Sequence, residues 1–208
     1  MSPIAIAALV MDYADAAGVR VGTPQFIGPR SLQQWPKVMI GDYVSVARST
    51  TDSWSWHDSI GNTRDGDLWH TADPAVISAL VWLINKRVTR ARNEIEYLVE
   101  PAGAQSYTAA LLAAADRAVY AAQIGARFRA HPHSEGMVVR PSVVVDDVVV
   151  EWSRREDKKH QWGAPWLVCD RHGEVLPPSA AHAHGYAFDA IRHAILIVAR
   201  ARMEAAFP

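Results

Sequence analysis

The stretch D-P-A-V-I-S-A-L-V-W-L-I-N-K-R-V-T-R-A-R-N-E-I-E-Y-L, residues 73–98, decides the fold of this protein. Asp73-Pro74 pairs a capping carboxylate with a proline at the first turn, which is typical of a helix start. Apolar residues then recur at helical spacing, which predicts one long amphipathic helix that forms the backbone of the domain. They are Val76, Ile77, Leu80, Val81, Ile84, Val88, Ala91, Ile95 and Leu98.

A second long helix is expected directly after the first. Pro101-Ala-Gly103 breaks the first helix, and residues 106–129 are rich in alanine and again apolar at helical spacing. A short break between two long helices favours an antiparallel pair. The alanines would allow the two helices to approach closely.

Strands are predicted on both sides of this helical pair. Residues 38–46 have β-branched residues around a Gly41-Asp42 turn, and residues 137–152 are dense in valine around Asp146-Asp147. Valine loses side-chain freedom in a helix and packs well on a pleated sheet. Residues 166–176 predict a further hairpin with Arg171-His172-Gly173 at its tip. After Pro177 the chain predicts a final helix to its end.

The expected fold class is therefore α+β. Two long antiparallel helices and a C-terminal helix pack with short antiparallel strands and hairpins, in one domain that spans residues 1–208. Residues 1–36 form an N-terminal helix and loop extension, because Ser2-Pro3 caps a short helix that Gly18 ends and several prolines and glycines follow.

Composition excludes several classes of protein. Half of the 208 residues are apolar, about a fifth are charged and the net charge is −1, which gives no overall attraction to nucleic acid or anionic membrane. The single cysteine, Cys169, excludes an intramolecular disulfide and favours a reducing cytoplasm. Neither a signal peptide nor a membrane span is predicted. With 17 arginines against 4 lysines, a high-GC bacterial or phage genome is expected.

One candidate surface is basic. Lys86, Arg87, Arg90 and Arg92 concentrate on the second half of the first long helix. Such a cluster suits phosphate recognition in nucleic acid. The competing interpretation is that these residues complement the helix macrodipole, with Arg90 paired to Glu94 and Arg92 paired to Glu96.

A second candidate surface is aromatic. Trp54 and Trp56 are two residues apart, and Trp162 and Trp166 form another local cluster among the eight tryptophans. Alternate residues of a strand share one face, so Trp54 and Trp56 either cap the core together or expose an apolar patch for a partner. Core packing is the favoured interpretation.

The third candidate is the stretch H-A-H-G-Y-A-F-D-A-I-R-H, residues 182–193. His182, His184, Asp189 and His193 could converge on a zinc-type metal ion, with Asp189 and His193 one helical turn apart. The favoured alternative is a set of polar residues on a helix that fills the core. Cys169 is interpreted as a small buried residue and His172 as exposed at a hairpin tip.

No nucleophilic serine motif, phosphate-binding loop or dinucleotide fingerprint is present in the sequence. No cofactor is therefore expected. The leading hypothesis is a small cytoplasmic interaction or regulatory protein without catalytic activity, which binds a protein partner or forms a homodimer. The alternatives are a nucleic-acid-binding protein that uses the arginine-rich helix, and a metal-dependent enzyme that uses the C-terminal His/Asp cluster.

Overall fold

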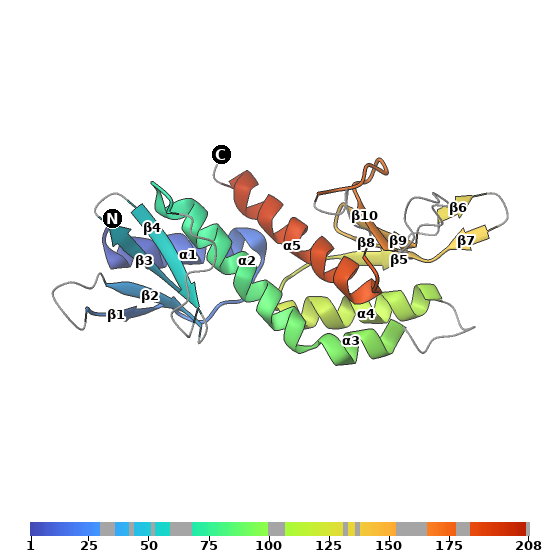
Figure 1. The fold of residues 1–208 in the computed structure, drawn as a ribbon, viewed down its shortest axis with the longest axis horizontal. Coiled ribbons are helices and arrows are strands. Elements are labelled where there is room, and N and C mark those ends of the chain that lie inside the picture. The colour runs from blue at the N-terminus through green and yellow to red at the C-terminus, as the bar shows by residue number, and fades with distance from the viewer. Residues whose placement is uncertain are drawn as a thin grey trace. The chain divides into compact units, whose positions relative to one another are not determined.

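Helices and antiparallel strands share the described part of the chain, which confirms the predicted α+β class (Figure 1). The computed structural model describes residues 1–29, 36–41, 44–50, 53–58, 68–99, 107–130, 133–135, 138–152, 166–177 and 184–206. Among these residues are five helices, two four-stranded antiparallel sheets and a two-stranded hairpin.

The chain divides into two compact units. The first unit combines Met1–Ile84 with Ala199–Pro208, and the second unit is Asn85–Val198. The predicted single domain with an N-terminal extension stays a prediction.

The first unit is built on a meander of four antiparallel strands. The strands follow one another in space as β1 (Gln25–Ile27), β2 (Lys37–Ile40), β3 (Val44–Thr50) and β4 (Ser53–Asp58). The predicted turn at Gly41 is present between β2 and β3, and its positive φ of 60° suits a residue without a Cβ. β1 comes from the stretch that sequence reasoning expected to be a connecting loop.

Two helices cover this sheet. α1 (Pro3–Ala17) is capped as expected, because the Ser2 hydroxyl accepts from the Ala5 amide and Gly18 ends the helix in the left-handed conformation. It packs on β1 and β2. α2 (Ala72–Arg90) packs on β4, where the Trp56 indole donates to the Ser78 hydroxyl over 3.0 Å and stacks at a tilt on Trp82.

The long helix predicted for residues 73–98 is interrupted. α2 ends at Arg90, and α3 (Arg92–Val99) begins after Ala91. The Thr89 hydroxyl donates to the Asn85 carbonyl over 2.7 Å, and the Ala91 amide reaches only three residues back to Val88. A hydroxyl bonded to the preceding turn bends a helix, so these contacts account for the break.

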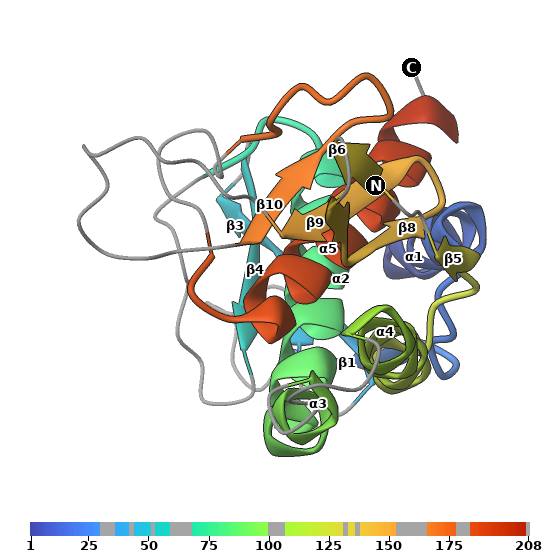
Figure 2. The same ribbon diagram turned by 90° about the vertical axis from the view of Figure 1, so that its right-hand side faces the viewer.

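The second helix is shorter than predicted. α4 is Tyr107–Ala122, and the next residue, Gln123, has a positive φ of 55°. The prediction that residues 106–129 form one helix is wrong at its C-terminal end, because Phe128–Ala130 form strand β5 and pair with Val143–Val145. α3 and α4 lie side by side and antiparallel (Figure 2). An ion pair between Glu94 and Arg117 joins them.

The second unit has a sheet in the order β10-β9-β8-β5. The turn predicted at Asp146-Asp147 joins β8 (Ser142–Val145) to β9 (Val148–Trp152), and β10 (Trp166–Cys169) lies at one edge. Both faces of the sheet are buried along β8 and β10. One face carries a cluster of Val144, Val149, Leu167 and Cys169. A separate hairpin joins β6 (His133–Glu135) to β7 (Val138–Arg140).

The predicted C-terminal helix is α5 (Ala187–Ala206). In the second unit it buries an apolar stripe that includes Phe188, Ile191 and Ile195. In the first unit the Arg202 guanidinium donates to the Ala17 carbonyl over 2.7 Å, which satisfies a carbonyl at the end of α1. In the part of the chain that the structure describes, no helix is long and apolar enough to cross a membrane.

Candidate functional site

The exposed edge of the first sheet is the main candidate for partner binding. β1 pairs with β2 on one side, with Phe26 opposite Val38, and all of its residues are exposed. Phe26 is 59% exposed and Ile27 is 38% exposed. We call Gln25–Ile27 the β1 edge. An edge strand presents backbone donors and acceptors to a further strand, and proteins usually protect such an edge with charged residues. The β1 edge has none.

The described tryptophan candidates lie in the core. Trp54 and Trp56 are buried on β4, and Trp166 is buried on β10 against the edge of Trp152. Trp162 lies outside the described residues. Neighbouring residues Ser53 and Ser55 are also buried, because β4 is covered on both faces. In this chain the described indoles therefore serve core packing.

The basic candidates divide into two kinds. Arg87 turns inward and donates to the Ala122 carbonyl over 3.3 Å, which caps the end of α4, and burial lowers its pKa. Arg92 forms the expected ion pair with Glu96 over 2.7 Å, whereas Glu94 pairs with Arg117. Lys86 and Arg90 are exposed on α2. The structure thus brings the four residues onto neighbouring turns, where Arg87 and Arg92 bind groups of the protein itself.

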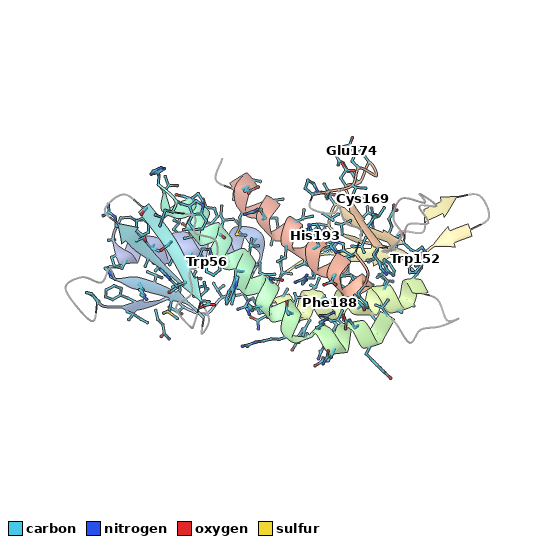
Figure 3. All side chains as sticks on the ribbon, in the orientation of Figure 1. Trp56, Trp152, Cys169, Glu174, Phe188 and His193 are labelled. Atoms are coloured by element: carbon cyan, nitrogen blue, oxygen red, sulfur yellow. The ribbon has the colours of Figure 1, made fainter. Side chains whose placement is uncertain are left out.

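A pair of histidines joins the start of α5 to the chain before it. Nε2 of His184 lies 3.1 Å from Nδ1 of His193, and Nε2 of His193 lies 3.1 Å from the Pro177 carbonyl oxygen. The two rings meet edge to face. We call His184 and His193 the histidine pair; Figure 3 labels His193 on α5.

The contacts of the histidine pair determine its proton positions. The Pro177 carbonyl can only accept, so Nε2 of His193 carries a proton. In a neutral His193, Nδ1 then has the lone pair and accepts from Nε2–H of His184. The neutral pair therefore forms one directed chain of hydrogen bonds, from His184 to His193 to Pro177.

Burial favours this neutral state. It lowers the pKa of His184, where the charge of Asp189 acts in the opposite direction and that of Arg192 acts in the same direction. Burial also lowers the pKa of His193, and repulsion from His184 and Arg192 lowers it further. Burial disfavours a charged imidazole because it removes the water that would solvate the charge.

The metal alternative finds only part of its ligand set. His184 and His193 come together, but the Asp189 carboxylate accepts from the Arg192 guanidinium over 3.1 Å in an ion pair. His182 lies outside the described residues. Among the described residues, no group of three or more His, Cys, Asp or Glu side chains could hold a metal ion. Cys169 is buried and His172 is exposed at the turn after β10.

Sequence reasoning missed two parts of these sites. The strand that carries Phe26 and Ile27 lies in a stretch rich in proline and glycine, which was interpreted as a loop. The apolar pair between Pro24 and Gly28 was the feature of the sequence that could have indicated a short strand. The Pro177 carbonyl is a backbone group, for which the sequence carries no signal.

A scan against protein-family models and searches of curated proteins and of solved structures found no match to this chain, so its function is argued from its own residues.

Proposed function

We propose that this protein is an interaction or regulatory protein without catalytic activity, which binds through the β1 edge. The observation that supports this proposal most directly is a sheet edge on which Phe26 and Ile27 are exposed and no charge stands. Addition of a strand to such an edge supplies backbone hydrogen bonds for affinity and side-chain contacts for specificity. The sequence also supports a cytoplasmic location, since it has a single cysteine.

A second copy of the chain is the partner that this edge fits. Antiparallel pairing of two β1 strands about Phe26 would place Gln25 of each copy opposite Ile27 of the other. This arrangement brings no charges together and sets the two Phe26 side chains against each other. Aromatic pairs across antiparallel strands stabilise a sheet by up to about 1 kcal/mol.

Sedimentation velocity across a range of concentrations tests this proposal. The wild-type chain is expected to dimerise, and Phe26→Lys is expected to weaken the dimer at least about tenfold, because two like charges would stand directly opposite each other. Tyr97→Lys is the matched control, since Tyr97 is 74% exposed on α3 and lies outside the β1 edge. A wild-type chain that stays monomeric, or equal weakening by both variants, would contradict the β1 edge as the binding surface.

Nucleic-acid binding remains a second candidate because Lys86 and Arg90 are exposed one helical turn apart. Tyr120, which is exposed on α4, also lies under the Arg117 guanidinium at 5.7 Å. Exposed cations suit phosphate contact, and an exposed aromatic ring suits base stacking. The β1 edge is favoured over this surface because Arg87, Arg92 and Arg117 already bind protein groups.

A further inference from the structure

The edge of the second sheet is covered by the chain that follows it. After β10 the chain turns back, so that Val175 bridges to Cys169 and the Leu176 amide donates to the Val168 carbonyl over 2.9 Å. Farther along, His184 and Trp166 exchange two backbone hydrogen bonds of 2.8 and 3.1 Å. We call these residues, 175–177 and 184, the cover segment. They occupy backbone groups of β10 that a foreign strand would otherwise reach.

The histidine pair attaches both described parts of the cover segment to α5. His193 holds Pro177 through its backbone carbonyl and holds His184 through its side chain. Because His184 is itself bonded to Trp166, the side-chain contact and the backbone bridge support each other. Loss of the contact between the two imidazoles would therefore weaken the cover over the Trp166 end of β10.

We propose that the histidine pair is a proton-controlled latch, which holds the cover segment on the β10 edge when it is neutral and releases it when both imidazoles are protonated. The reason is the distance between facing nitrogens, 3.1 Å. One added proton can be shared, since an imidazolium donates to a neutral imidazole. Two added protons leave an N–H on each facing nitrogen, no lone pair to accept, and two like charges in contact.

The charged neighbours do not remove this repulsion. On α5, Asp189 acts on His184 but is hydrogen bonded to the guanidinium of Arg192, which also donates to Asn85 of α2 over 3.0 Å. Arg92 of α3 adds positive charge near Asp189. Trp166 and Pro177, which bind the histidine pair from the described parts of β10 and the cover segment, carry no charge.

The sign of the pH dependence follows from the released state. Released imidazoles titrate near their ordinary pKa of 6.5, whereas burial holds the pKa values in the closed latch below this value. The released state therefore binds more protons below about pH 6.5, and acidification favours opening. Above that pH both states are neutral and the latch stays closed.

Amide hydrogen exchange on the full chain, read by NMR and corrected for intrinsic exchange rates, tests the latch. The Trp166 and His184 amides report on the bridge. We expect their protection to fall at least about tenfold from about pH 7.5 to about pH 5, which corresponds to about 1.4 kcal/mol. The Asp146 amide, which donates to the Arg127 carbonyl in the same sheet, should keep its protection. Unchanged bridge amides, or equal loss at Asp146, would overturn the proposal.

A substitution separates the latch from general acid sensitivity. His193→Gln removes one of the two titrating imidazoles and the repulsion between them, but keeps a donor for Pro177 and an acceptor for His184. The pH dependence at the bridge amides should therefore weaken, because only the burial of His184 is left to favour opening in acid. His172→Gln is the matched control, because His172 is exposed at the turn. Persistence of the wild-type pH dependence in His193→Gln would contradict the latch. If this variant does not fold, the wild-type exchange data decide, together with an NMR titration of the two imidazoles in the wild-type chain. The latch requires the histidine pair to take up its two protons in two separate steps, and a single shared step would contradict it.

Discussion

Single residues set the turns of this fold, and Asp146 shows how. It adopts a positive φ of 52°, a conformation that costs most L-residues roughly 1 to 2 kcal/mol but that Asp and Asn tolerate better. Its side chain accepts from the Arg127 amide over 2.9 Å, and its own amide donates to the Arg127 carbonyl over 2.7 Å. Asp146 thus forms part of the turn between β8 and β9 and also binds the residue before β5.

Replacement of Asp146 should therefore cost more than replacement of its neighbour. We expect Asp146→Ala to lower the free energy of unfolding by about 1 to 2 kcal/mol, since it loses a hydrogen bond and adds left-handed strain. Asp146→Asn should stay within about 0.5 kcal/mol of wild type, and so should Asp147→Ala at the exposed neighbouring position. Urea unfolding followed by circular dichroism measures all three. An Asp147→Ala loss as large as that of Asp146→Ala would refute this role.

At the scale of elements, local signals predicted the boundaries that single residues set, and tertiary contacts decided other boundaries. Ser2, Gly18 and Gly41 act through their own backbone or side chain, and the elements they bound were predictable. Phe128 was assigned to a helix because its apolar spacing fits one, but pairing with Val145 places it in β5. The contact between His184 and His193 likewise depends on a bridge to Trp166, which lies far back in the sequence.

The contact between α1 and α2 gives a prediction at this scale. The Tyr13 hydroxyl donates to a carboxylate oxygen of Asp73 over 3.0 Å, and burial, together with this carboxylate, raises the pKa of Tyr13 from 10 to about 12. Between these values the unfolded state has lost the phenolic proton and the folded state has kept it. The folded state binds more protons there, so this contribution to stability is complete below pH 10 and is lost as the pH rises toward 12.

The substitution Tyr13→Phe isolates this contribution. At neutral pH it should lower the free energy of unfolding by about 1 kcal/mol, because Asp73 loses a donor. The difference in the free energy of unfolding between wild type and variant should then narrow by about 1 kcal/mol from about pH 9 to about pH 11. Guanidinium unfolding at each pH measures it, with Tyr97→Phe as the exposed control. A difference that stays constant with pH would show that the hydrogen bond to Asp73 does not hold the phenolic proton.

At the scale of the whole molecule, the boundaries between the two compact units fall inside helices. One lies between Ile84 and Asn85 within α2, and the other lies between Val198 and Ala199 within α5. Domain boundaries usually fall in exposed linkers where the chain can bend freely. A helix instead forms cooperatively, because nucleation is unfavourable whereas each residue added to an existing helix forms one more backbone hydrogen bond. Unfolding of either unit would therefore fray two helices that the other unit needs.

This connectivity predicts that the two units unfold in one transition, as expected for a single domain. Native-state hydrogen exchange at increasing denaturant should give the same free energy of global unfolding for amides in β3 and in β9. Tyr13→Phe, which lies in the first unit, should lower both values equally, because a single cooperative transition has a single free energy. If the variant lowers the value in β3 and leaves that in β9 unchanged, the units are separate domains, and each helix has a point where it melts independently.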